Sequence, residues 1–179
     1  MIFVAGVSSS GKTYMLRRLA ERRPDIVVIS GSQTLSSLGR PLRALTPEEA
    51  LGNQWVLLAK LSARDLLAEA RAILDGHAII ETTAGPMAIP ETWYDAANFA
   101  GFVQVEAEPK TLAERRSSRG LPWTEREAGE LQTLERRELL RHSTRLGRPY
   151  LAVRSDEVEV VEAWVDRVVS SPAADAGGH

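Results

Sequence analysis

A glycine- and serine-rich segment close to the N-terminus has residue types and spacing that suit phosphate binding. It runs from Gly6 to Thr13 and matches the pattern GxxxxGK[ST] in full. In such a loop the glycines let backbone N–H groups turn inward around phosphate oxygens, and the positive end of the following helix adds to the attraction. Lys12 would reach the β- and γ-phosphates of a nucleotide, and the Thr13 hydroxyl would ligate Mg²⁺. The residues predicted to contact the nucleotide are Gly6, Ser8, Ser9, Ser10, Gly11, Lys12, Thr13 and Tyr14.

A carboxylate and two threonines lie in the middle of the chain. Residues 77–82 are predicted to form a buried strand, and Glu81 lies at its end. A carboxylate placed there can approach the metal directly or through water. We therefore predict that Glu81 is a metal partner or a catalytic base; the alternative is a strand-end carboxylate bonded to neighbouring loop amides. Thr82 and Thr83 either hold the acceptor or water, or satisfy their own turn.

A run of arginines follows the next predicted strand. Arg115 and Arg119 are four residues apart, so a persistent helix places them on one face, and Arg116 lies beside them in the run. Planar guanidinium groups suit bidentate contacts to phosphate and neutralise charge on a phosphoryl group in transfer. The alternative is a solvated helix face, the more common role of such a run. Residues 120–122, Gly-Leu-Pro, then interrupt the helices, as a moving cover over the phosphates requires.

Strands alternate with helices along the chain and supply the framework for these groups. The predicted strands cover residues 1–5, 26–29, 77–82, 102–106 and 150–153. Capping boxes at Thr46 and Thr124 begin two of the helices, and the first is predicted to continue to about residue 75, with Gly52 as a candidate break. This alternation predicts an α/β fold with right-handed crossovers, helices on both faces of a parallel sheet, and ligands at the carboxyl ends of the strands.

Composition narrows the class of protein. A chain of 179 residues with 44% hydrophobic residues suits one domain, predicted at 1–169, followed by a flexible polar tail at 170–179. The formal net charge of -2 gives no global basic field, so no nucleic-acid partner is expected. The absence of cysteine excludes disulfides and thiolate metal sites and fits a cytoplasmic protein. No segment reaches membrane-spanning length, so no membrane partner is expected.

The order of these features resembles the P-loop small-molecule and nucleoside monophosphate kinases, most of all the archaeal-type adenylate kinase group. The resemblance covers residues 1 to about 169 and rests on the phosphate loop, on Ser-Gly-Ser at 30–32, and on the LxxRxxxR pattern that begins at Leu112. It implies a three-layer α/β/α P-loop NTPase fold with a five-stranded parallel sheet and a short lid. It also implies that residues 30–32 lie near the acceptor, that the acidic residue of the third strand lies near the metal, and that the arginines cover ATP. Glu81 stands where relatives commonly have aspartate.

The segment after the second predicted strand bears on the acceptor. Kinases that phosphorylate an alcohol generally need a carboxylate to accept its proton, and relatives often have an aspartate at this place. Here the sequence reads Ser-Gly-Ser-Gln at 30–33, so an acceptor that is already an anion fits better. Arg40 and Arg43 either bind the acceptor phosphate or lie at a solvated helix end. The predicted acceptor-binding residues are Ser30, Gly31, Ser32, Arg40 and Thr82.

The leading prediction is a kinase that uses ATP and Mg²⁺ to phosphorylate a small acceptor, with a nucleoside monophosphate favoured. Its predicted catalytic residues are Lys12, Glu81, Arg115 and Arg119, and its predicted metal ligands are Thr13 and Glu81. One alternative is a hydroxyl kinase for a sugar, metabolite or antibiotic, with Glu81 as the base. Another is a regulatory ATPase that hydrolyses slowly and binds a macromolecule. A monomer or homodimer is expected.

Overall fold

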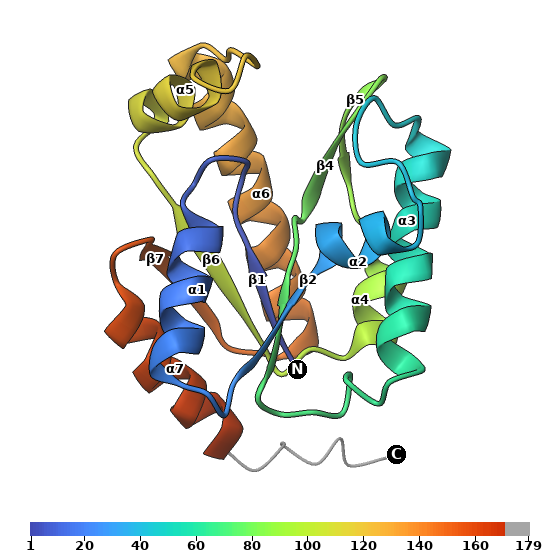
Figure 1. The fold of residues 1–179 in the computed structure, drawn as a ribbon, viewed down its shortest axis with the longest axis vertical. Coiled ribbons are helices and arrows are strands. Elements are labelled where there is room, and N and C mark those ends of the chain that lie inside the picture. The colour runs from blue at the N-terminus through green and yellow to red at the C-terminus, as the bar shows by residue number, and fades with distance from the viewer. Residues whose placement is uncertain (171–179) are drawn as a thin grey trace.

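A five-stranded parallel sheet forms the centre of the computed structural model, which describes residues 1–170 (Figure 1). The strand order is β2-β3-β1-β6-β7, and every pairing in this sheet is parallel. The strands are β1 (Ile2–Ala5), β2 (Val27–Ser30), β3 (Ala72–Asp75), β6 (Gly101–Glu106) and β7 (Tyr150–Arg154). Because parallel neighbours need long crossover connections, helices come to cover both faces of the sheet. The predicted fold class, a three-layer arrangement around five parallel strands, is confirmed.

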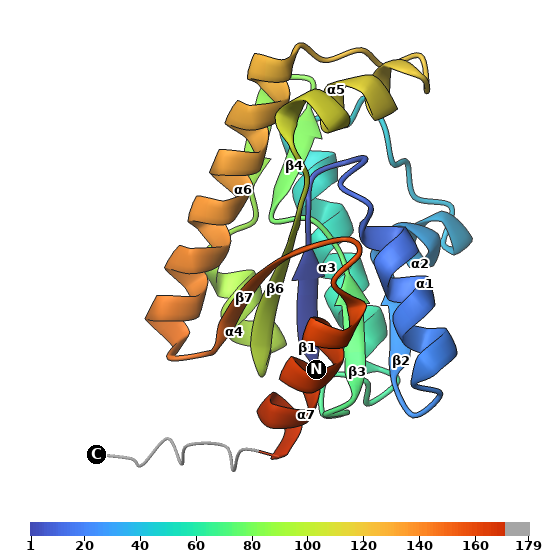
Figure 2. The same ribbon diagram turned by 90° about the vertical axis from the view of Figure 1, so that its left-hand side faces the viewer.

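The helices divide between the two faces of the sheet (Figures 1 and 2). One face is covered by α1 (Lys12–Arg22) and α7 (Val158–Ser170), and the other by α3 (Pro47–Ser62), α4 (Glu91–Ala97) and α6 (Glu125–Leu146). The short helix α2 (Gly31–Ser37) follows β2 directly. Helix α5 (Pro109–Ser117) lies beyond the carboxyl ends of the strands, as Figure 2 shows. No helix among residues 1–170 is long and apolar enough to cross a membrane.

The central strand β1 is buried on both faces. Ile2 and Val4 belong to the apolar cluster under α1 and α7, whereas Phe3 and Ala5 belong to the cluster on the opposite face. The Phe3 ring centroid lies 5.0 to 6.4 Å from four other aromatic rings, those of Trp93, Tyr94, Phe99 and Phe102. This packing fixes the strand whose end carries the phosphate loop, because aromatic side chains bury a large apolar area.

The prediction for residues 47–82 is wrong in its second half. Helix α3 ends at Ser62, without interruption at Gly52, and residues 72–75 form β3 in the middle of the sheet. A short apolar run fits a buried strand and a buried helix equally well, which explains the error. Residues 79–82 form β4 (Ile79–Thr82), which pairs antiparallel with β5 (Gly85–Ala88) in a separate two-stranded hairpin. Glu81 therefore does not end a strand of the parallel sheet.

Helix ends differ in how well local signals predicted them. The capping boxes at Thr46 and Thr124 are both present and begin α3 and α6. The predicted loop at residues 30–32 is wrong: Ser30 is the N-cap of α2, and its hydroxyl accepts a hydrogen bond from the Gln33 N–H at 3.3 Å. Of the predicted C-terminal tail, Ser170 is the last residue of α7, and residues 171–179 lie outside the described part of the chain.

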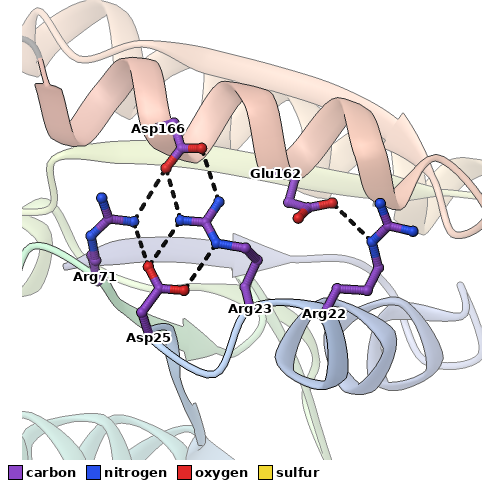
Figure 3. A network of polar contacts seen from close by, with 6 residues as sticks. All are labelled: Arg22, Arg23, Asp25, Arg71, Glu162 and Asp166. Carbon is purple, nitrogen blue, oxygen red and sulfur yellow. Dashed lines mark hydrogen bonds and ion pairs between the residues drawn. The ribbon is translucent and has the colours of Figure 1, made fainter.

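Ion pairs join the elements at the amino ends of the strands (Figure 3). Arg23 donates two hydrogen bonds to Asp25 and two to Asp166, all at 2.9 Å, and Arg71 donates to the same carboxylates at 2.7 and 3.2 Å. The hydrogen bonds from Arg23 lower the pKa of Asp25 to about 2 and also lower the pKa of Asp166. Bidentate pairing has a specific geometry. The network therefore sets α7 against the end of α1 and the starts of β2 and β3.

A buried histidine makes the stability of the fold depend on pH. His142 in α6 is fully buried and stacks on Tyr94, with ring centroids 3.8 Å apart. Burial, together with the charges of Arg141 and Arg145, lowers the pKa of His142 to about 4 from its ordinary 6.5. Between these two values the unfolded chain binds more protons than the folded chain, so stability falls as the pH falls from 6.5 to 4.

The variant His142→Phe keeps an aromatic ring beside Tyr94 but does not titrate. Between pH 7 and pH 4.5 we expect the parent to lose about 2 kcal/mol more free energy of unfolding than the variant. Urea unfolding at the two pH values measures this difference. Equal losses in the parent and His142→Phe would mean that His142 does not cause the acid sensitivity.

Candidate functional site

The loop between β1 and α1 has the geometry of an anion site. Ser9 and Gly11 adopt positive φ angles of 74° and 94°, and the Ser10 N–H donates to the Val7 carbonyl at 3.1 Å. Helix α1 begins at Lys12, and its N-cap Gly11 offers no side-chain hydrogen bond. The first N–H groups of a helix lack intrahelical partners and attract anions. The loop predicted from the sequence is therefore folded as a phosphate cradle requires.

Two glycines of the loop are required by close packing. A Cβ at Gly6 would lie 2.6 Å from the Val105 carbonyl oxygen on β6. A Cβ at Gly11 would lie 2.6 Å from the Ser155 side chain, in the segment that follows β7. These contacts hold the loop against the two strands on one side of β1. The hydroxyls of Ser9 and Ser10 are buried and have no hydrogen-bond partner within residues 1–170.

Lys12 and Asp75 form a nearly buried ion pair at the centre of the site. The Lys12 Nζ contacts Asp75 Oδ1 and donates a hydrogen bond of 2.7 Å to the Gly76 carbonyl. The exposed fractions of the two charged side chains are only 9% and 12%. Asp75 ends β3 and is in register with Val4 of β1. The acid at the strand end is therefore Asp75, and the sequence signal that identifies it is the apolar run at 72–74 followed by aspartate and glycine.

A cavity of about 1060 Å³ opens in front of the loop. Residues 7–14 line it, and so do Arg115 and Arg119. Arg115 also donates a hydrogen bond of 3.2 Å from Nη1 to the Ser9 carbonyl. Arg136 and Arg154 add two further guanidinium groups to the lining. The structure thus brings the predicted arginines to the phosphate loop, although Arg115 is 106 residues from Ser9 in sequence.

The predicted acceptor residues do not line this cavity. The hydroxyl of Ser30 caps α2 and lies 3.1 Å from that of Ser32. Arg40 donates from Nε to the Asn53 side chain at 2.7 Å, and Thr82 donates to the Gly85 carbonyl at 2.7 Å inside the hairpin turn. These side chains have structural partners. Ser30 is nevertheless in register with Asp75, so the end of β2 lies beside the acid.

Glu81 has a partner other than the phosphate site. Its Oε2 accepts a hydrogen bond of 2.7 Å from Nη2 of Arg116. The carboxylate is half-exposed, and Glu81 does not line the cavity. The position predicted for Glu81, at the carboxyl end of a sheet strand beside the loop, is occupied by Asp75.

Sequence reasoning missed His77 and Glu135. His77 lines the cavity, and its Nδ1 lies 3.7 Å from Oε1 of Glu135, whose side chain is only 1% exposed. The same Glu135 oxygen accepts a hydrogen bond of 2.8 Å from the Ala78 N–H. A buried carboxylate on α6 therefore holds the segment that follows Asp75. Glu135 lies in a strongly charged helix, so the residues around it in the sequence do not indicate that its side chain is buried.

The ion pair predicts a distinctive stability pattern. The variant Asp75→Asn leaves the charge of Lys12 buried without a counter-ion, and we expect a loss of about 3 kcal/mol in the free energy of unfolding. Adding Lys12→Met removes the unpaired buried charge and should recover most of the lost free energy of unfolding. Urea unfolding at pH 7 measures this free energy for the parent, Asp75→Asn and the double variant. As control, Asp156→Asn breaks an exposed pair with Arg154 and should change stability by at most about 0.5 kcal/mol. If Asp75→Asn has the same free energy of unfolding as the parent, the Lys12–Asp75 pair is not buried as expected.

Comparison with known families matches residues 5–135 to the sequence model of a family described as an AAA domain. This match covers well over half of the chain. No curated protein matches the chain in sequence.

Solved structures share the fold across nearly the whole chain. A gluconokinase from Sinorhizobium meliloti is 20% identical with a TM-score of 0.50, covering 94% of this chain and 90% of that one. A sugar kinase from Janibacter sp. is 16% identical with a TM-score of 0.56, covering 96% and 98%. A deoxyadenosine kinase from M. mycoides is 13% identical with a TM-score of 0.52, covering 93% and 98%. At these identities the similarity is one of fold.

Proposed function

Because the chain belongs to the AAA domain family, with which residues 5–135 align, we propose that it is a P-loop phosphotransferase that uses ATP to phosphorylate a small acceptor. The observation that carries this proposal is that Lys12, Arg115 and Arg119 border a single cavity of about 1060 Å³. Phosphoryl transfer is catalysed chiefly by positioning and by neutralising charge. These side chains and the loop amides supply both. The same fold serves kinases of small molecules, including a gluconokinase and a deoxyadenosine kinase.

Lys12 changes partners in this proposal. Without nucleotide, its ammonium group is held by Asp75 and by the Gly76 carbonyl. With phosphates in the loop, Lys12 donates to phosphate oxygens, and the Asp75 carboxylate becomes available to other cations. The pair thus keeps a lysine desolvated and directed at the site before substrate arrives, which lowers the reorganisation needed during transfer.

The Mg²⁺ that accompanies ATP would be held by few protein groups. Thr13 presents an exposed hydroxyl in the first turn of α1, and Asp75 presents a carboxylate at the end of β3. No group of three or more His, Cys, Asp and Glu side chains that could hold a metal occurs in the part of the chain that the structure describes. Mg²⁺ usually binds one or two protein oxygens together with substrate phosphates and water, and it offsets phosphate charge. We therefore assign to Asp75 the metal role expected of Glu81.

A nucleoside monophosphate remains the proposed acceptor. In this proposal Asp75 holds Mg²⁺ once Lys12 has moved to phosphate, and Glu81 is paired with Arg116, so neither acid is assigned as a base. An acceptor that is already an anion needs no general base. The second candidate is a hydroxyl kinase, favoured by His77 at the cavity wall with the buried Glu135 carboxylate behind it, an arrangement that suits proton acceptance from an alcohol.

Two finer assignments also remain proposals. We propose membership of the archaeal-type adenylate kinase group only from the order of motifs in the sequence, whereas the kinases named above support the broader group of P-loop kinases. The absence of cysteine fits a reducing compartment, and we propose the cytoplasm.

Transfer from radiolabelled ATP to a panel of nucleoside monophosphates, sugars and deoxynucleosides, with Mg²⁺ present, tests the function. We expect phosphorylation of at least one acceptor class by the parent. We expect a loss of about 100-fold or more in Lys12→Ala, because a buried donor to the transferring phosphate is removed. Lys60→Ala removes a lysine on α3 that does not line the cavity and should behave as the parent. Release of inorganic phosphate without any transfer would instead favour a regulatory ATPase.

The arginines on the cavity wall should act mainly in the transition state. We expect Arg119→Ala to lower kcat more than it weakens ATP binding, because a guanidinium that meets charge only during transfer contributes to kcat. The loss should reach about 10-fold, and it should be larger in the double variant with Arg115→Ala if the two share the task. Rapid-quench kinetics measure kcat, and calorimetry measures the affinity for ATP. Values of kcat within about twofold of the parent in both single variants would place these arginines on a solvated face.

A further inference from the structure

Arg116 lies between the two cavity-lining arginines in sequence but faces a different part of the molecule. It does not line the cavity. Its Nη2 donates to Glu81 Oε2 at 2.7 Å, and its guanidinium carbon lies 3.6 Å from the centroid of the Trp123 ring. The side chain is 11% exposed, and its Nε is buried without a partner among residues 1–170. A guanidinium that is stacked, paired and nearly dry is held in one orientation.

These contacts join three segments that are far apart in sequence. Arg116 belongs to α5, Glu81 to the β4–β5 hairpin, and Trp123 to the segment just before α6. Figure 1 shows α5 and the hairpin at the same end of the molecule. A small apolar cluster lies under them and contains Val7 of the phosphate loop together with Ile79, Leu112, Ala128 and Leu131. Loop, hairpin and α5 therefore share one local core, with the Arg116 contacts at its polar side.

The orientation of α5 depends on this anchor. Successive residues of an α-helix point about 100° apart, so fixing one side chain fixes the directions of its neighbours. Leu112 anchors α5 one turn earlier, in the apolar cluster. Arg116 supplies the second anchor, immediately after Arg115 and three residues before Arg119. The two anchors together determine how Arg115 faces the phosphate loop. Arg119 lies in the turn just after α5, where its N–H donates to the Arg116 carbonyl at 3.0 Å, so its place follows from that of Arg116.

We propose that Arg116 is a positioning residue: through Glu81 and Trp123 it locks α5 to the β4–β5 hairpin, so that the hairpin sets where Arg115 and Arg119 stand. This inference rests on the proposed phosphotransferase function. Glu81 then acts through Arg116 and does not ligand the metal. A lysine cannot replace Arg116, because only a planar guanidinium can stack on Trp123 while it pairs with Glu81.

The test uses Arg116→Met, Arg116→Lys, Glu81→Gln and the double variant Arg116→Met with Glu81→Gln. The matched control is Arg126→Met with Glu130→Gln, which breaks an exposed ion pair of the same 2.7 Å length on α6. We expect Arg116→Met to lower kcat by about 10-fold or more with ATP affinity changed by less than about threefold, because a small misplacement of the arginines costs rate more than binding. Arg116→Lys should not rescue kcat. The double variant should be no slower than Arg116→Met, since both changes break one interaction.

Amide hydrogen exchange supplies a readout that does not depend on catalysis. Breaking the lock in either single variant should raise exchange in α5 and in the hairpin together, with the rest of the sheet unchanged. If the parent transfers phosphate to no acceptor, the proposed function fails while exchange still tests the lock. Three results would each overturn the positioning role. Hydrogen exchange could change in α5 and in the hairpin independently, or the effects of the two single variants on kcat could add in the double variant. The third is a kcat for Arg116→Met within about twofold of the parent value. A loss of ATP affinity as large as the loss of kcat would show instead that Arg116 touches the nucleotide.

Discussion

The ion pair between Lys12 and Asp75 is the interaction on which the site depends. It forms because β1 and β3 are neighbours whose carboxyl ends coincide, and because Gly11 adopts a left-handed conformation that starts α1 directly after the loop. Two desolvated charges persist only when they satisfy one another, and the Gly76 carbonyl adds a further acceptor for the ammonium group. The lysine is thus held in a dry place facing the loop, where a phosphate can succeed the carboxylate as its partner.

Helix α5 adds a second element to the lining of the cavity, through Pro109, Thr111 and Arg115. Three arginines on α5 and in the turn after it have three different environments: Arg115 contacts the Ser9 carbonyl, Arg119 lines the cavity, and Arg116 pairs with Glu81. Composition alone suggests one solvated basic face. Arg115 and Arg116 have different contacts because adjacent side chains of a helix point in different directions and meet different elements. A short helix can in this way connect the phosphate loop to a hairpin that lies outside the main sheet.

The parts of the fold that were predicted correctly rest on local signals. The phosphate loop, the capping boxes at Thr46 and Thr124, and the strands at 102–106 and 150–153 each follow from a few consecutive residues whose preferences agree. The errors occur where local signals are ambiguous. Residues 72–74 continue an apolar spacing that suits a helix, and only their burial between β1 and β2 makes them a strand. That error moved the acidic position from Asp75 to Glu81.

The sequence by itself determined the phosphate cradle, because its eight residues are contiguous and their glycine content specifies the backbone conformation. The shared helix face predicted for Arg115 and Arg119 is wrong, because α5 ends at Ser117 and Arg119 lies in the turn beyond it; both nevertheless line the cavity. Tertiary structure alone decided the partners. Asp75 is 63 residues from Lys12, and Glu81 is 35 residues from Arg116. Which charges meet over such separations depends on strand order and register, and these are set by burying the whole sheet between two helical layers.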